Sequence, residues 1–306
     1  MKQVGAKRRR SYVELTSWLF TGAAVLSLLT GLILLLCQSI PVWGHEGFSF
    51  FSGKEWFFRT DTFGAASMIY GTIVVAIIAL LVAAPLGIGS AIFAVEFLPQ
   101  RLRLALKITV ELLAGIPSVV YGLLGILLLR NWIYDLLVDF DLLSGDTLLT
   151  AGILLGIMIL PTIMTLADDA LSGVPGAQRT AARGLGLNAS EVTIFVSLPQ
   201  ALPGLLSALL LGLGRAMGET IAVFLVVGRQ DNQLPETLLS LRPLLESGQT
   251  LSSKLGGSET NIAYGQPLHW SAMLGLGLTL LVLVTLVTLF GLWLRGRSER
   301  RAFRVA

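Results

Sequence analysis

The sequence has little of what catalytic and metal sites in soluble proteins use. Its 306 residues include one cysteine, Cys37, and two histidines, His45 and His269. A single cysteine excludes an intramolecular disulfide and a cysteine-based metal site, and no His, Cys and Asp cluster has metal-ligand spacing. The isolated histidines are expected to be inert, and no Ser-His-Asp arrangement can be argued. No Gly-x4-Gly-Lys-Ser/Thr loop is present, so we expect no ATP binding by this chain. The sequence therefore predicts no enzyme, no bound cofactor and no metal.

Charge is also scarce. Only 13% of residues are charged and 54% are hydrophobic, which is too apolar for a soluble domain of this size. Apolar stretches of roughly 20 residues recur, each long enough to cross a bilayer core of about 30 Å as a helix. The net charge of +3 comes from basic residues beside these stretches and does not indicate nucleic-acid binding. The sequence predicts an integral membrane protein in contact with lipid.

Six membrane-spanning helices are predicted within a permease domain at 17–294. A basic start before an apolar run also suggests a signal peptide, but this run is too long and no convincing cleavage site follows it, so we expect an uncleaved anchor. An aromatic-rich segment at 38–65, with its rings at the membrane interface, and a flexible polar loop at 228–267 are expected outside. Basic tails are expected at 1–16 and 295–306. The expected spans are 17–37, 67–98, 108–129, 148–167, 201–227 and 268–294.

Lysine and arginine are distributed unevenly between the two sides of these spans. They concentrate in the two tails, in the turn before the third span and in the segment after the fourth. Because basic residues favour the cytoplasmic side, both termini and the segment at 176–199 are predicted to be cytoplasmic. The expected location is the bacterial inner membrane, crossed several times.

The segment 176–199, called the elbow below, is predicted to form two short helices. The first would run from Gln178 to Leu185 and break at Gly186, since glycine reaches positive φ without strain. Asn188 with Glu191 three residues later predicts a capping box that starts a second helix, which we expect to end by Pro199. The elbow thus connects the fourth and fifth spans as a helix-turn-helix.

The spacing within the elbow resembles the EAA loop of ATP-binding-cassette importer permeases. Thr180 stands where that family has Glu, which removes a carboxylate, and Val196 stands where it has Ile. The resemblance implies that the elbow docks into a cleft on a cytoplasmic ATPase. An ordinary amphipathic loop is the alternative. The expected coupling residues are Thr180, Ala181, Ala182, Gly186, Leu198 and Pro199.

The fifth span contains two ionisable residues, Arg215 and Glu219, which are four residues apart and so would share one helix face. Charges at mid-membrane depth normally line a bundle interior or a wet path. A guanidinium can bind phosphate oxygens, so Arg215, Glu219 and the adjacent Thr220 are expected to line a substrate pathway. The alternative is an Arg-Glu pair that only holds the bundle together. Gly214 and Gly218 form a small-xxx-small stripe that predicts a contact with another helix.

The third span is predicted to be broken at Pro117, which lacks a backbone donor. Ser118 and Tyr121 place hydroxyls beside the break, and broken helices are tolerated where backbone lines a cavity or is buried against protein. We therefore add both to the expected substrate pathway. Lys107 and Glu111 are expected to form an interfacial ion pair at the start of this span.

Four segments resemble the phosphate-specific (Pst) transporter permeases, in particular their PstC-type subunit: 69–72, 84–89, 114–122 and 214–220. The PstA-type subunit remains an option. The resemblance implies an all-α, six-helix type I (MetI-like) importer fold. It also implies a heterodimer with a PstA-like permease, two PstB-like ATPases that carry ATP and Mg, and a PstS-like external phosphate-binding protein.

These observations lead to a predicted permease of a binding-protein-dependent importer of inorganic phosphate. Glu219 could accept the proton that hydrogen phosphate carries and sulfate lacks. The same importer class with molybdate or sulfate as cargo is the nearest alternative. A secondary anion transporter or channel that works without ATP is another, and a structural or sensory membrane subunit is a third.

Overall fold

The computed structural model describes residues 2–140, 142–234 and 242–305, with side chains from residue 12 to residue 297 within these ranges. Almost all of this chain is helical. Five helices in the described part are long and apolar enough to cross a membrane, and a bent pair supplies a sixth crossing if it counts as one span. The side chains of 1–11 and 298–306, and residues 235–241 of the expected loop, lie outside the described residues.

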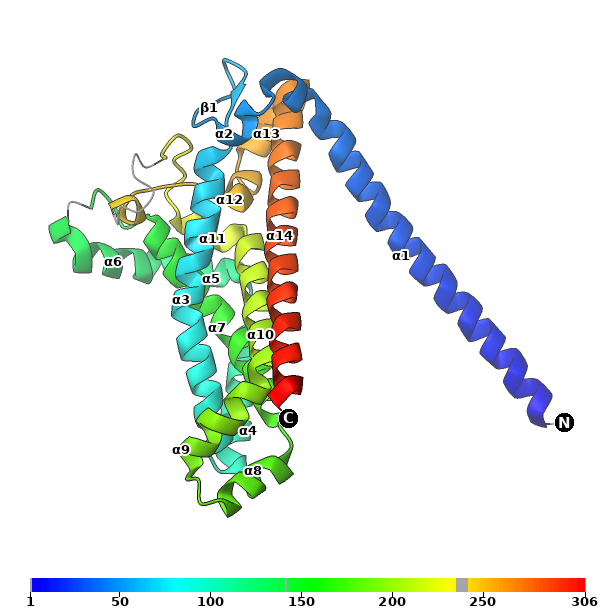
Figure 1. The fold of residues 1–306 in the computed structure, drawn as a ribbon. Helices are drawn as coiled ribbons and strands as arrows, with labels where there is room; N and C mark the ends of the chain where they lie inside the picture. Colours follow the sequence, from blue (N-terminus) through cyan, green and yellow to red (C-terminus); the bar gives the residue numbers. More distant parts are fainter. Residues whose placement is uncertain (1, 141, 235–241, 306) are drawn as a thin grey trace.

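The bundle consists of α3 (Ala66–Glu96), α7 (Leu148–Ser172), α10 (Leu198–Gly218) and α14 (Pro267–Val305), which run along a common axis in Figure 1. α7 is the most buried of the candidate spans. It approaches α3 closely because glycine leaves room: a Cβ on Gly152 would lie 2.5 Å from Cβ of Ile78. The main core cluster forms around this contact, with residues such as Leu155 and Ile159 fully buried.

The first helix, α1 (Lys2–Glu46), differs from its expected bounds. A tail at 1–16, a span at 17–37 and a separate exterior segment from 38 are expected from the sequence. In the structure, one helix continues from the tail through Pro41 to Glu46. It diverges from the bundle in Figure 1, and none of its most apolar window is buried. Only the far end is tied to α14, where the Val42 amide donates to the Ser271 hydroxyl at 3.0 Å.

A compact cap covers the end of the bundle where α1 meets α14. The cap comprises residues 47–65 and 242–266. It contains α2 (Ser49–Ser52), an antiparallel pair of β1 (Trp56–Phe57) and β2 (Thr62–Phe63), a 3-10 turn (Arg242–Leu245), α12 (Leu251–Leu255) and α13 (Glu259–Ala263).

The cap corrects two expectations. Phe50, Trp56 and Phe63 are buried in a cluster with residues of α3 and α14, so these rings pack within the protein. The other rings Phe48, Phe51 and Phe57 are exposed, and their place at the membrane interface stays a prediction. Ser253 and Lys254 are buried in α12, which has a capping box at Thr250, so this part of the expected flexible loop is folded. Local caps allow such short helices to form between two spans.

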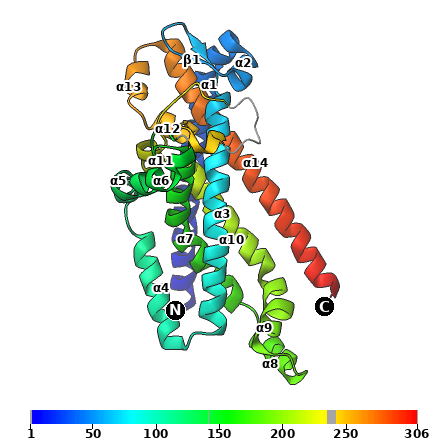
Figure 2. The same cartoon turned by 90° about the vertical axis from the view of Figure 1, so that its left-hand side faces the viewer.

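The third crossing is sharply bent. α4 (Gln100–Ala114) is followed at Pro117 by α5 (Ser118–Leu124), a π-helical turn (Gly125–Leu129) and α6 (Arg130–Leu137). The two arms meet at 87°, and α6 leads away from the bundle in Figure 1. In Figure 2, which is turned by 90°, the same arm points toward the viewer. The predicted break at Pro117 is confirmed, whereas the expected span 108–129 is not one straight crossing.

The elbow consists of α8 (Gly176–Gly184) and α9 (Ala189–Val192), at the end of the bundle opposite the cap. The Gly186 break is confirmed at φ 90°, and so is the Asn188–Glu191 capping box. The expected end at Pro199 is wrong, because the helix continues from Ala189 to Gly218. A π-helical turn (Thr193–Ser197) lies where the missing N–H of Pro199 would have bonded.

Candidate functional site

Two helix breaks lie next to each other inside the bundle. The first separates α4 from α5, and the second separates α10 from α11 (Ile221–Val226) at Glu219 and Thr220. α5 and α11 touch closely: a Cβ on Gly122 would lie 2.6 Å from Leu225, and one on Gly125 would lie 2.8 Å from Val226. The two short helices that follow the breaks are therefore in direct contact with each other. Breaks of this kind within a membrane protein belong beside a cavity or against protein.

Arg215 lies at this junction, in the last turn of α10. Its Nη1 donates to the Thr162 hydroxyl at 3.0 Å, and Tyr121 is within range of its charge. The free carbonyls at a helix C-terminus favour a cation there. The side chain is otherwise exposed within this chain. Thr162 was not singled out from the sequence, although its position directly after Pro161 could have drawn attention to it.

The expectation that Arg215 and Glu219 share one helix face is wrong. α10 ends at Gly218, and Glu219 has extended backbone, so the two side chains do not share a helix face. No ion pair joins them in the described part of the chain. The Glu219 carboxylate instead accepts from the Ala222 amide at 3.4 Å, in the first turn of α11, and the Glu219 carbonyl accepts from the Ser252 hydroxyl at 2.8 Å. Glu219 thus helps to start the next helix.

The three expected hydroxyl residues have different surroundings. Tyr121 is buried and donates to the Leu113 carbonyl at 2.9 Å, which connects the two arms of the bend. The Thr220 hydroxyl bonds weakly to the Gly218 carbonyl at 3.4 Å, and its methyl group touches Gly256 of the cap. Ser118 is half-buried at the start of α5. Within the described part of the chain, the Ser118 hydroxyl makes no hydrogen bond, in contrast to the hydroxyls of Tyr121 and Thr220.

The glycine stripe makes no contact within this chain. A Cβ added at Gly214 or Gly218 would meet no atom within 4 Å. The close approach on α10 occurs instead at Gly212, where a Cβ would lie 2.7 Å from Ile163 of α7. Gly214 and Gly218 therefore remain available for a helix outside this chain, and their role as a contact stays a prediction.

The elbow exposes an apolar surface. Leu185 at its turn is 84% exposed and Phe195 after it is 67% exposed, whereas Ala182 is buried against the bundle side. Thr180 is exposed, and its hydroxyl bonds to the Gly176 carbonyl of its own helix at 3.0 Å. The remaining expected coupling residues Ala181, Gly186 and Pro199 are exposed, and Leu198 is half-buried. The coupling role of this set stays a prediction.

Ion pairs tie the helices together at the elbow end. Arg103 of α4 binds Asp168 of α7 through both nitrogens of its fork, at 2.8–3.0 Å. Lys107 binds Asp169 at 2.8 Å rather than Glu111, so the expected pair within α4 is wrong. α4 lies alongside α7 at this end of the bundle. Lys107 therefore pairs with a carboxylate of α7 rather than with one of its own helix.

A second charged cluster was missed from the sequence. It is centred on Lys254 and Glu259 of the cap and is called the cap cluster below. Lys254 is 2% exposed; its ammonium contacts Asp231 at 2.5 Å and also Glu259. Glu259 further accepts from the Trp56 indole at 2.5 Å and contacts His269 Nε2 at 2.9 Å. His269 is buried, so it is not the isolated border residue that was expected.

The pKa values of the two carboxyl groups in the cap cluster are shifted in opposite directions. Burial opposes the ionised form of Glu259, but the hydrogen bond and charge of Lys254 outweigh it, so the pKa of this carboxyl lies below its usual value. For Asp231 burial prevails and raises its pKa, although Lys254 pulls in the opposite direction. A single buried cation thus contacts two carboxyl groups, so the cluster has no unpaired positive charge to offer an anion.

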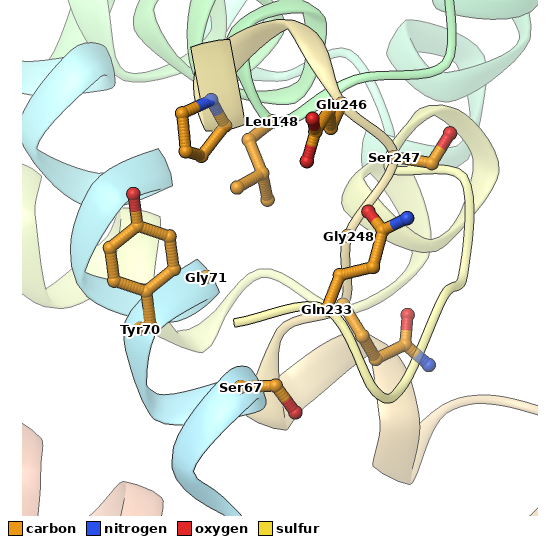
Figure 3. Close-up of a pocket in the computed structure, with 10 residues that line it drawn as sticks. Ser67, Tyr70, Gly71, Leu148, Gln233, Glu246, Ser247 and Gly248 are labelled. Atoms are coloured by element: carbon orange, nitrogen blue, oxygen red, sulfur yellow. The ribbon is translucent and has the colours of Figure 1, made fainter. Parts of the chain in front are cut away.

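A small pocket lies beneath the cap (Figure 3). It is lined by α3 residues including Tyr70, by Leu148 at the start of α7, and by the segment around Glu246. Its described lining residues include this carboxylate and no lysine or arginine. The electrostatics therefore disfavour an anion here, and Arg215 remains the better candidate.

The sequence has relatives among transport proteins. Residues 83–304 match the family of binding-protein-dependent transport system inner membrane components. A phosphate transport system permease protein PstC of Mesorhizobium japonicum is 35% identical over 294 residues, covering 90% of this chain and 87% of the relative. A PstC of Pasteurella multocida is 36% identical, covering 84% and 82%. A probable ABC transporter permease, YqgH of Bacillus subtilis, is 36% identical, covering 86% and 82%.

Solved structures show the same fold. A chain of the MetNI methionine ABC transporter in an inward-facing conformation superposes with a TM-score of 0.55 at 18% identity, covering 76% of this chain and 94% of the other. A chain of a bacterial ABC transporter that imports the polysaccharide alginate gives a TM-score of 0.53 at 17% identity, covering 92% and 96%. The predicted all-α, MetI-like importer permease fold is thereby confirmed.

Proposed function

The chain belongs to the binding-protein-dependent inner membrane permeases, among the PstC-type proteins, and from this membership we propose that it is the transmembrane permease subunit of an ATP-driven importer of inorganic phosphate. The observation that carries the proposal is Arg215: a guanidinium with one neutral hydrogen-bond partner, beside two helix breaks. Arg215 has no carboxylate partner among the described residues, so its charge attracts an anion, and its forked donor suits phosphate oxygens.

The surroundings of Arg215 support an anion path. α11 begins directly after the α10 turn that carries Arg215, α5 packs against α11, and helix N-termini favour negative charge. The Ser118 hydroxyl at the start of α5 offers a further donor. Glu219 is not neutralised by Arg215 as in the ion-pair alternative, so its carboxylate is available to accept a hydrogen bond from the proton of hydrogen phosphate. Sulfate lacks this proton, and this difference favours phosphate over sulfate as cargo.

The elbow supports coupling to ATP. Its exposed apolar side chains, Leu185, Ile194 and Phe195, form the kind of surface that a partner protein covers. We place there a PstB-like ATPase, two copies per transporter, which carries ATP and Mg; this chain binds no cofactor. A PstA-like permease would complete the pore beside the Gly214 and Gly218 stripe, and a PstS-like protein would deliver phosphate at the cap.

In this arrangement both chain termini and the elbow face the cytoplasm, and the cap faces outward. ATP binding and hydrolysis on the partner move the elbow and alternate the access to Arg215. A channel or secondary transporter has no need of such an elbow, which disfavours that alternative. Molybdate or sulfate as cargo would keep the mechanism and change only the selectivity.

Uptake of labelled phosphate tests the proposal, in cells that lack their own high-affinity system and carry this chain with its partner subunits. We expect uptake that requires this chain and resists excess unlabelled sulfate or molybdate. Arg215→Gln should lower kcat/KM for phosphate at least tenfold. The matched control is Arg101→Gln, an exposed arginine at the start of α4, which should remain within about twofold of the wild type. Assembled transporters with no chain-dependent phosphate uptake would refute the proposal.

A further inference from the structure

Glu96 is the last residue of α3 and lies where three segments of the chain meet. Its side chain is 2% exposed, and its Oε1 contacts Arg179 Nη1 of α8 at 3.2 Å. The same oxygen accepts from the Ser197 hydroxyl at 3.3 Å, just before α10. A buried carboxylate of this kind needs its partners, because it is costly to leave a charge unpaired away from water.

Arg179 adds a connection to a fourth helix. Its Nη2 donates to the Leu171 carbonyl in the last turn of α7, at 2.5 Å. A cation is favourable at this helix C-terminus. The planar fork of one arginine therefore holds α8 to the ends of both α3 and α7 in a fixed geometry. Within the described residues, this is the ion pair that connects α8 to the bundle; Arg103 and Lys107 connect α4 to α7 instead.

We propose that Glu96 and Arg179 are the positioning pair that transmits movement of the elbow to the bundle, through α3 and α7 directly and through Ser197 to α10. This inference rests on the proposed function, because it assigns the route between a partner ATPase and the site at Arg215. α10 carries Arg215, and α7 carries Thr162, which binds it. Any displacement of α8 that reaches these two helices changes the surroundings of the anion site.

Thr180 makes the assignment sharper. It replaces the expected glutamate, and its hydroxyl bonds within α8. The residue before it, Arg179, points in the opposite sense, into the bundle, where it is largely buried. The elbow thus has an uncharged hydroxyl, that of Thr180, on its exposed side and the charged guanidinium of Arg179 on its bundle side. Docking of the ATPase and transmission of its movement therefore involve different residues.

The test uses the whole transporter reconstituted in vesicles, with phosphate uptake and ATP hydrolysis measured on the same preparation. Glu96→Gln and Arg179→Gln should each lower the phosphate moved per ATP about tenfold, while the ATPase still co-purifies. Arg179→Lys keeps the charge but cannot reach both partners, so it should restore the ratio only in part. Lys107→Gln removes an ion pair at the same end without touching the elbow, and its ratio should equal that of the wild type.

Hydrogen exchange with and without a non-hydrolysable nucleotide gives a readout that does not depend on the cargo. In the wild type, nucleotide should change exchange in α8, in the last turn of α3 and around Ser197. In Glu96→Gln the change in α8 should persist and the other two should disappear. An unchanged response of α3, an unchanged phosphate-to-ATP ratio, or loss of the bound ATPase would each overturn the inference. Wild-type vesicles that show the exchange response without phosphate uptake would refute the proposed cargo alone.

Discussion

Replacing Lys254 with methionine should destabilise the cap in a way that depends on pH. Methionine keeps most of the apolar stem but removes the ammonium that Asp231 and Glu259 share. Both carboxyl groups are largely buried, with side-chain exposures of 26% and 17%. Removal of one partner from a buried ion pair leaves uncompensated charge and costs about 3–5 kcal/mol.

Protonation sets an upper limit to this cost. Neutralising one carboxyl group costs about 1.4 kcal/mol for each pH unit above its ordinary pKa. At pH 7.5 that is about 4 kcal/mol for a group such as Glu259, and at pH 5.5 it is about 1.4 kcal/mol. In the wild type the lowered pKa of Glu259 contributes stability that is present above its unfolded pKa and is lost as the pH falls through its folded pKa. The variant has lost this contribution, so it should approach the wild type as the pH decreases.

Thermal unfolding of the purified transporter in detergent, followed by tryptophan fluorescence, measures the effect. We expect Lys254→Met to lower the Tm by about 5–10 °C at pH 7.5 and by about a third of that at pH 5.5. The double variant with Glu259→Gln should recover part of the loss, and Lys54→Met, an exposed lysine on the same cap, should change neither value. An equal Tm loss at both pH values would refute the reasoning, because the penalty would then not arise from unpaired carboxylates.

Two further predictions concern the bundle and the anion site. Gly152→Ala should lower the free energy of unfolding by about 1–3 kcal/mol in the same assay, because its Cβ would press on Ile78 of the adjacent helix. Thr162→Val removes the hydroxyl that holds Arg215, and should lower kcat/KM for phosphate uptake about 3–10-fold, in line with one lost hydrogen bond.

Matched variants separate these effects from general damage. Gly89→Ala on α3 introduces a Cβ into open space and should be neutral or slightly stabilising. Thr165→Val removes a hydroxyl that bonds only to the Pro161 carbonyl of its own helix, at 2.9 Å, and should leave uptake unchanged. A loss at Gly89 equal to that at Gly152, or at Thr165 equal to that at Thr162, would contradict the two assignments.

Local features of the fold could be predicted because they depend on neighbouring residues. The Gly186 turn needs only a residue that tolerates positive φ, and the capping box needs only Asn188 and Glu191 at the right spacing. The break at Pro117 follows from a missing donor. Spans such as α3 and α7 were found because bilayer thickness sets a minimum length of apolar helix.

The errors involve contacts between distant segments. Arg215 and Glu219 have helical spacing, but α10 ends at Gly218, where cap residues such as Ser252 bond the Glu219 backbone. Lys107 pairs with Asp169 of α7, 62 residues away, rather than with Glu111 one turn along α4. The cap cluster consists of residues from the hairpin, the loop and α14. These residues are far apart in the sequence, so no local pattern predicts the cluster.

The separation of α1 from the bundle has a consequence for the order in which the protein is built. Hydrocarbon tails solvate the side chains of Trp18, Phe20 and Leu28 as well as a protein neighbour would, so an unpacked α1 carries little penalty in the bilayer. Because α1 precedes the bundle helices in the chain, it can enter the membrane and remain there while those helices are still being made. Its attachment near Val42 fixes only the far end. The other helices can thus form the bundle before α1 packs against any further helix. Insertion of α1 into the membrane and its packing are then two separate steps.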